Sequence, residues 1–331
     1  SGSLSLCRTL FNYSVLLSSL SKRSADPPLF MCLDPSTPSP MAKSLSLIAA
    51  SDVPRPFNLA TPHRPHAVLH PFSDLIESQD LYLAQVSTLI QRASRRLMNG
   101  RRNSRGGAIC KLPSVLTQTR PGRDLLIQTL EILNPSLVLV VNHPLTAHIL
   151  KERGFNGKDC SKLVKNAPDM SAFVRGPEMR RRERQNSVRE YFWGPSGEFT
   201  PIRVRCNIDS LPLYKAMPPL DQSALPIGEE PMLCDVSRVT DITDMRGHVL
   251  AVIAMPNPRG DRVKVEGEKE DAEPPTISVT MSALSSGTVL GYISVSEANG
   301  ETGDIQYLAP RSGPLPPSSV LFETGLVWNG E

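Results

Sequence analysis

The feature that most constrains the fold is a change in hydrophobic pattern near residue 200. Before this point, short apolar runs of strand length alternate with longer segments that repeat apolar residues at helical spacing. After it, short apolar runs follow one another, separated by Pro and Gly. Alternation indicates a mostly parallel sheet covered by helices, whereas successive short strands indicate an all-β domain. We therefore expect an α/β domain followed by a small β domain.

The composition supports two folded domains. The chain has 331 residues, 40% hydrophobic and 21% charged, which supplies a core and excludes wholesale disorder. A formal net charge of +3 excludes a histone-like polycation, and 5% aromatic content argues against a platform that stacks RNA bases. The six cysteines are scattered without CxxC spacing, so we predict no metal site.

The pattern also places individual elements. Residues 35–79 hold many Pro and Ser, and both a loop and short β pieces are consistent with them. Residues 4–20 could be a signal sequence, but Arg8 interrupts the apolar run, which favours an internal helix of a chain truncated at its start.

The apolar spacing predicts the helices and strands one by one. Helices are expected at 5–20, 80–98, 122–133 and 144–153, and strands at 29–33, 108–112, 137–141, 202–206, 233–236, 249–253, 289–295 and 320–323.

Asp34 is the candidate catalytic residue. It directly follows the buried strand expected at 29–33, and ligands of open α/β sheets bind beyond the carboxyl ends of strands. A carboxylate there can hold Mg²⁺ or accept a hydroxyl proton in phosphoryl transfer. The alternative is that Asp34 and Pro35 only begin a turn, and the local sequence leaves both interpretations open.

A second candidate site is the basic run at 175–189, which contains six Arg. Guanidinium groups bind phosphate through two parallel hydrogen bonds, so Arg180, Arg181 and Arg184 could close over phosphates or contact an RNA backbone. The alternative is a solvated basic helix.

Several segments, taken in order, resemble one family. The chain resembles the eukaryotic RNA 5′-hydroxyl polynucleotide kinases, a family that includes the Clp-type subunit of the pre-mRNA cleavage and polyadenylation machinery. The resemblance implies a P-loop NTPase-like (RecA-like) α/β domain and a Walker-B-like role for Asp34. The matching segments are Cys7-Arg8 with Leu10 and Asn12-Tyr13, Leu33-Asp34-Pro35, Asp80-Leu81-Tyr82-Leu83, Arg189-Glu190-Tyr191-Phe192-Trp193-Gly194, Leu213-Tyr214-Lys215, Leu225-Pro226-Ile227-Gly228 and Ile305-Gln306-Tyr307-Leu308-Ala309-Pro310 with Leu315-Pro316.

The departures from the family concern its phosphate-binding loop, G-x-x-x-x-G-K-[ST]. The resemblance places Gly2 on the last glycine, Ser3 where the phosphate-binding Lys belongs and Leu4 on the Mg²⁺-binding hydroxyl, with Ser5 beside it. Upstream glycines and the family's first β-rich domain are absent from these 331 residues. The segment 113–118 lacks the Trp of active kinases and is more similar to members with a structural role.

The resemblance therefore implies three regions. We expect a kinase-like domain without its P-loop and first strand at 1–174, an arginine-rich lid and connector at 175–198, and a C-terminal β domain at 199–331. Gly2, Ser3, Ser5, Arg180, Arg181 and Arg184 are the expected nucleotide- or phosphate-binding residues.

The expected function is that of a non-catalytic nuclear subunit (a pseudokinase) that scaffolds cleavage and polyadenylation factors. Its partners would include a termination factor, with RNA as a further partner and no membrane. The resemblance implies ATP and Mg²⁺ as cofactors, the departures argue against both, and residual ATP binding stays open. The alternative is an active ATP-dependent RNA 5′-hydroxyl kinase in tRNA, rRNA or mRNA processing.

Overall fold

A computed structural model shows two compact units. It describes residues 2–20, 28–37, 41–49, 66–99, 107–141, 143–154, 161–164, 176–219, 233–255, 277–316 and 319–328. Unit 1 comprises residues 1–67 and 73–184, and unit 2 comprises residues 68–72 and 185–331. The sequence-based boundaries at 174 and 198 stay a prediction; the structural division falls between Arg184 and Gln185, inside helix α5 (Pro177–Trp193).

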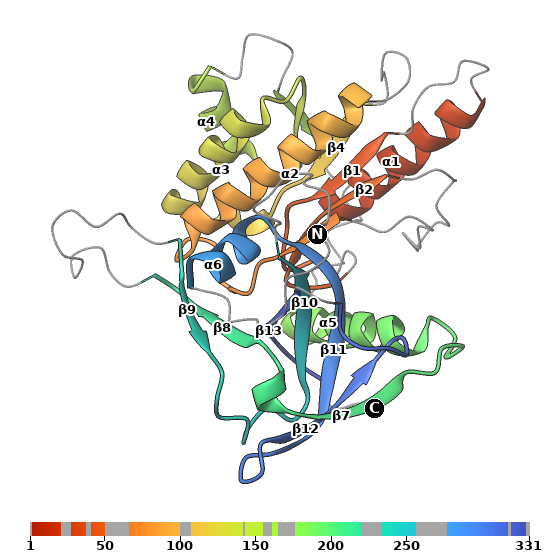
Figure 1. Cartoon of the computed structure of the whole chain (residues 1–331). Helices are drawn as coiled ribbons and strands as arrows, with labels where there is room; N and C mark the ends of the chain where they lie inside the picture. The colour runs from red at the N-terminus through yellow and green to blue at the C-terminus, as the bar shows by residue number, and fades with distance from the viewer. Residues whose placement is uncertain are drawn as a thin grey trace, which may run out of the picture. The chain divides into compact units, whose positions relative to one another are not determined.

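Unit 1 is built on a four-stranded sheet in the order β3-β2-β1-β4, of which Figure 1 labels β2, β1 and β4. The last two residues of the edge strand β3, Val68 and Leu69, fall in the residue range of unit 2. Strand β1 pairs parallel with β4 and antiparallel with β2. A separate two-stranded parallel sheet joins β5 and β6. The strands are β1 (Leu29–Cys32), β2 (Ser44–Ala49), β3 (His66–Leu69), β4 (Ala108–Lys111), β5 (Val138–Val141) and β6 (Ser161–Val164).

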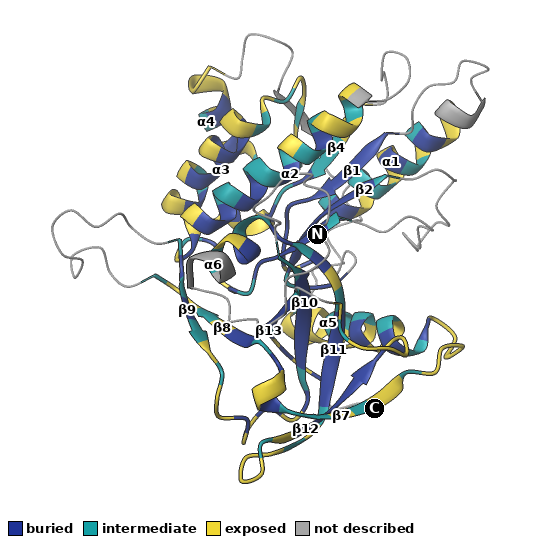
Figure 2. Cartoon of the chain, in the orientation of Figure 1, coloured by how far each residue is buried: buried dark blue, intermediate teal, exposed yellow. Residues whose placement is uncertain are grey.

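Helix α1 (Gly2–Leu20) covers one face of the four-stranded sheet. Phe11 is fully buried and lies 5.4 Å, centroid to centroid, from the ring of Phe30 on β1. Met31 and Leu47 point to the opposite face and are also buried, as expected for a sheet covered on both sides. Figure 2 shows strand β1 in the colour of buried residues. Further helical elements are α2 (Gln79–Asn99), η1 (Ser114–Thr117), α3 (Arg120–Leu133) and α4 (Pro144–Glu152).

Unit 2 contains a seven-stranded sheet in the order β7-β12-β11-β10-β13-β8-β9. Neighbouring strands run antiparallel except β13 and β8, which are parallel. The sheet confirms the expected β domain, but helix α6 (Ile277–Ser286) departs from the all-β pattern expected after residue 200. The strands are β7 (Ile202–Asn207), β8 (Leu213–Met217), β9 (Asp235–Arg238), β10 (His248–Ala254), β11 (Thr288–Asn299), β12 (Asp304–Ala309) and β13 (Ser319–Val327); a short η3 (Ile208–Ser210) follows β7.

An aromatic cluster joins the end of α5 to the last residues of unit 2. The Phe192 ring is fully buried and stacks on Trp328 with centroids 5.7 Å apart. Trp193 meets the same Trp328 ring at 5.1 Å. The Tyr191 hydroxyl accepts a 2.9 Å hydrogen bond from the backbone N–H of Tyr292. The Arg-Glu-Tyr-Phe-Trp-Gly segment thus supplies core packing to unit 2.

This packing generates a stability prediction. Phe192→Ala removes a fully buried ring and should lower the free energy of unfolding of unit 2 by about 3–5 kcal/mol. Urea unfolding followed by tryptophan fluorescence measures it, because both tryptophans of the chain lie in this cluster. Phe199→Ala is the matched control: its ring is 54% exposed and the change should cost less than about 0.5 kcal/mol. Equal effects would contradict the assigned packing.

Candidate functional site

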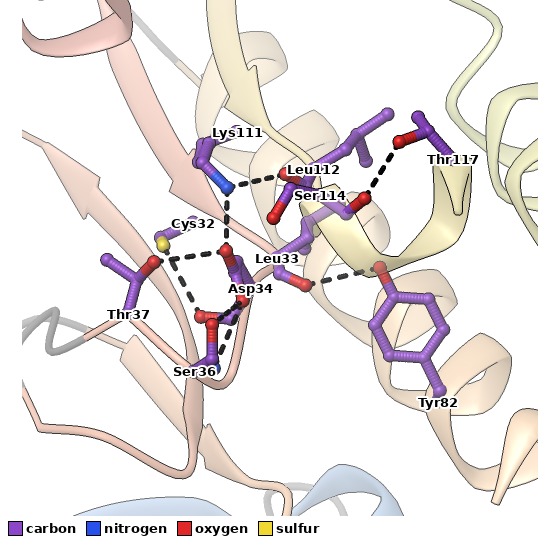
Figure 3. A network of polar contacts seen from close by, with 10 residues as sticks. All are labelled: Cys32, Leu33, Asp34, Ser36, Thr37, Tyr82, Lys111, Leu112, Ser114 and Thr117. Atoms are coloured by element: carbon purple, nitrogen blue, oxygen red, sulfur yellow. Dashed lines mark hydrogen bonds and ion pairs between the residues drawn. The ribbon is translucent and has the colours of Figure 1, made fainter. Parts of the chain in front are cut away.

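The site is formed where β1 and β4 end. The two strands run parallel with Cys32 opposite Lys111, so the residues that follow β1 meet the end of β4 at one edge of the sheet. The backbone N–H of Leu33 donates to the Lys111 carbonyl at 2.9 Å and continues the pairing beyond β1. Asp34 comes next, and its Oδ2 lies 2.6 Å from Nζ of Lys111 (Figure 3).

The Asp34 carboxylate accepts four hydrogen bonds from the described residues. Its Oδ1 accepts from the backbone N–H of Ser36 at 3.1 Å and from the Ser36 hydroxyl at 2.6 Å. Its Oδ2 accepts from the Thr37 hydroxyl at 3.1 Å and from Lys111 at 2.6 Å. A carboxylate offers about four acceptor positions, so each of these has a donor. The bonds to Ser36 form the Asp-initiated turn that is the simpler interpretation of Asp34-Pro35.

Lys111 and Asp34 form a buried ion pair. Their side chains are only 5% and 7% exposed. Lys111 also donates to the Leu112 carbonyl at 2.6 Å, so two of the three ammonium N–H groups have acceptors. Desolvating two charges is costly, and such a pair persists only where hydrogen bonds satisfy both partners. Removing one partner leaves an uncompensated buried charge at a cost of about 3–5 kcal/mol.

Burial and charge act in opposite directions on Asp34. Burial raises the pKa of this carboxyl, but the positive charge of Lys111 and the hydrogen bonds from Lys111 and Ser36 outweigh burial, so the net pKa lies below its ordinary value. The folded unit therefore holds Asp34 ionised near neutral pH. A carboxylate with a lowered pKa is a poor proton acceptor, which argues against a general-base role.

Tyr82 of α2 supports this edge from the helical side. Its hydroxyl donates to the Leu33 carbonyl at 3.2 Å, and the ring is fully buried. Burial raises the pKa of Tyr82 well above its usual value. Beside Asp34, burial raises the pKa of the Cys32 thiol to about 11. Both groups are therefore neutral and serve to position the end of β1.

Mg²⁺ does not fit this arrangement. It requires near-octahedral oxygen ligands at about 2.0–2.1 Å. Each acceptor position of Asp34 is taken, and the ammonium of Lys111 lies against the oxygen that a cation would approach. In the first turns of α1, Leu4 stands on the expected metal-binding position, and its buried side chain has no ligand atom. The described residues therefore present no metal-binding set at Asp34, and no step is assigned to a metal or nucleotide.

Three of the other predicted phosphate-binding residues lie at the start of helix α1. Ser3 and Ser5 lie in the first turns of α1, with Ser3 half-buried and Ser5 exposed. Gly2 begins the same helix. The roles of Gly2, Ser3 and Ser5 in phosphate binding stay predictions.

The predicted lid arginines lie on α5. Arg180 and Arg181 are exposed and Arg184 is half-buried. None of the three is among the donors to Asp34 in the part of the chain that the structure describes. Burial and, second, the positive charge of Arg184 lower the pKa of Lys43 to about 8, so Arg184 lies near the segment that follows Asp34. Their role toward phosphate stays a prediction.

Sequence reasoning missed Lys111. It stands at the end of the apolar run Ala108-Ile109-Cys110, where a charged side chain needs a buried partner. The signal was available, because parallel strands bring their carboxyl ends to one edge and Asp34 ends the neighbouring strand.

Two family models match the chain in succession. The model described as mRNA cleavage and polyadenylation factor CLP1 P-loop matches residues 1–194, and that described as Pre-mRNA cleavage complex II protein Clp1 matches residues 199–329. The chain belongs to the Clp1 family. Its membership confirms the resemblance and the expected P-loop NTPase-like domain followed by a β domain.

Curated Clp1 relatives resemble the chain over most of its length. A "Protein CLP1 homolog" of Dictyostelium discoideum is 25% identical over 338 residues, covering 99% of this chain and 65% of the relative. Another, from Arabidopsis thaliana, is 27% identical and covers 75% and 51%. The "Polyribonucleotide 5′-hydroxyl-kinase Clp1" of Xenopus laevis is 25% identical and covers 97% and 67%. The chain thus spans about half to two thirds of these Clp1 proteins.

Two solved structures share the Clp1 fold. A wild-type Clp1p–Pcf11p complex matches with a TM-score of 0.72 at 19% identity, over 99% of this chain and 72% of the solved one. A second structure, described as an extended Pcf11p–Clp1p interface and a point mutant with ATP loss, matches with the same TM-score at 21% identity, over 97% and 71%.

The lowered pKa of Asp34 predicts an acid-sensitive unit 1. A carboxyl with a folded pKa below its unfolded value, about 3.9, contributes stability that is present above the unfolded pKa. That stability is lost as pH falls through the folded pKa. Urea midpoints followed by circular dichroism should therefore fall more steeply below about pH 4 in the native protein than in Asp34→Asn/Lys111→Met. Parallel pH profiles would contradict an ionised, paired Asp34.

Proposed function

We propose that this Clp1-family chain is a non-catalytic subunit of the pre-mRNA 3′-end cleavage and polyadenylation machinery. The single observation that carries the proposal is the Lys111–Asp34 ion pair, which engages the carboxylate that the family resemblance marks as Walker-B-like. In P-loop enzymes such a carboxylate helps to hold the Mg²⁺ that bridges the transferred phosphates. A chain that uses it in an internal pair is suited to a scaffold.

The family descriptions and the structural neighbours support the scaffold. Both family descriptions name pre-mRNA or mRNA cleavage factors, and the solved relatives are complexes of Clp1p with Pcf11p. We propose a Pcf11-like termination factor and further cleavage-factor subunits as partners, and the nucleus as the site of action. The proposal includes residual ATP binding without hydrolysis.

An active RNA 5′-hydroxyl kinase is the second candidate. The observation that favours it is the Xenopus laevis relative, which is named a polyribonucleotide 5′-hydroxyl-kinase. This function requires metal-assisted transfer of the ATP γ-phosphate, for which Asp34 would have to be released from Lys111.

Affinity purification from nuclear extract, with mass spectrometry of the captured proteins, separates the two candidates. The scaffold predicts recovery of cleavage and polyadenylation subunits together with a Pcf11-like protein. Recovery of the tRNA-splicing endonuclease without those subunits would favour the kinase. The comparison variant is Phe192→Ala, which destabilises unit 2 and should reduce the recovery of partners that require its fold.

A scaffold role also predicts that 3′-end processing does not require the Asp34 carboxylate. Asp34→Asn/Lys111→Met removes both charges together and so leaves no unpaired buried charge. In an extract depleted of the endogenous protein, this variant should restore 3′-end processing to within about twofold of the native chain, a shift of about 0.4 kcal/mol. Lost processing with intact circular dichroism would contradict a non-catalytic role.

The lid arginines provide a separate prediction about RNA. If they contact phosphates, Arg180→Ala/Arg181→Ala/Arg184→Ala should weaken single-stranded RNA binding and reduce the slope of log K against log salt by about 2, since each phosphate that an arginine neutralises contributes about 0.7. Fluorescence anisotropy over a salt series measures this. The matched control removes the same charge from exposed positions of unit 2, as Arg203→Ala/Arg205→Ala/Arg246→Ala. Equal slopes in both variants would overturn the lid assignment.

A further inference from the structure

Lys111 lies against two oxygen atoms of a kind that can also bind a metal cation. Its Nζ lies 2.6 Å from Oδ2 of Asp34 and 2.6 Å from the carbonyl oxygen of Leu112. These two oxygens, together with the hydroxyls of Ser36 and Thr37 on the same carboxylate, are the hard oxygen donors that Mg²⁺ or Mn²⁺ prefers. The ammonium is a compact point charge and is bound by such oxygens in the same way.

Burial stabilises the Lys111 ammonium in its position beside Asp34. The Lys111 side chain is 5% exposed and that of Asp34 is 7% exposed, so water solvates neither charge well and each depends on its partner. A buried charge without its partner pays the full desolvation cost. A divalent ion could reach Asp34 only by displacing Lys111, whose ammonium has no second carboxylate to receive it among the described residues that it contacts.

We infer that Lys111 is the resident cation of the Asp34 site, and that this edge of the sheet binds divalent metal only when Lys111 is removed. The covalently attached ammonium holds the Asp34 turn in place without a metal. The inference stands on the geometry of unit 1 and does not depend on the proposed scaffold function. It assigns to Lys111 a positioning role in which it neutralises Asp34.

The test uses Mn²⁺ as the probe, with binding measured by electron paramagnetic resonance on the full chain. The native chain should bind no Mn²⁺ at Asp34, so its binding should equal that of Asp34→Asn/Lys111→Met. Lys111→Ala should gain one site, with a dissociation constant on the order of 0.1–1 mM. Asp34→Asn/Lys111→Ala should lose the new site. Lys151→Ala, which removes an exposed lysine from α4, is the matched control and should gain none.

Thermal unfolding supplies a second readout. Lys111→Ala should lower the midpoint of unit 1, followed by circular dichroism, by roughly 6–20 °C. Mn²⁺ should restore part of this loss in Lys111→Ala and leave the native midpoint unchanged. The tryptophan fluorescence midpoint of unit 2 should not move, because both tryptophans lie in unit 2.

A folded Lys111→Ala variant that gains no Mn²⁺ site would contradict the inference. Two further outcomes would also overturn it. One is Mn²⁺ binding by the native chain that disappears in Asp34→Asn/Lys111→Met, which would show that metal and Lys111 share the carboxylate. The other is ATP binding by the native chain that Lys111→Ala abolishes, which would make Lys111 a phosphate-binding lysine. If Lys111→Ala does not fold, the comparison of the native chain with the double variant decides alone.

Discussion

The ion pair between Lys111 and Asp34 is the interaction on which unit 1 depends most directly. It joins the carboxyl ends of β1 and β4, and the same carboxylate holds the turn through Ser36 and Thr37. Tyr82 of α2 fixes the adjacent Leu33 carbonyl. Strand pairing, the Asp34 turn and the contact of α2 thus meet at or directly beside one buried ion pair.

The sequence predicted the elements whose periodicity is clear. The strand at 29–33 and the helix at 80–98 are confirmed as β1 and α2, because a buried strand and an amphipathic helix leave distinct apolar spacings. Strands β2 and β3 stayed unresolved inside 35–79, because the Pro and Ser around them obscure short strands. Of the site, Asp34 was found as a strand-end carboxylate, whereas its partner lies 77 residues away and only strand pairing reveals it.

Unit 2 shows a different source of order. Its sheet is mostly antiparallel, and the aromatic rings of Phe192, Trp193 and Trp328 pack together beside it. The segment that best matches the family, Arg189 to Gly194, supplies two of these rings, so its contribution in this chain is to packing. Helix α6 escaped prediction because its Ser-rich sequence has little amphipathic character.

The buried ion pair also limits which substitutions this chain can accept at positions 34 and 111. A substitution that removes the charge at position 34 or at position 111 leaves the other charge buried without its partner. A second substitution that removes the remaining charge relieves this destabilisation. Proteins have little stability to spare, so most such first steps are removed by selection. Positions 34 and 111 are therefore coupled, so a change at one of them is tolerated only together with a compensating change at the other.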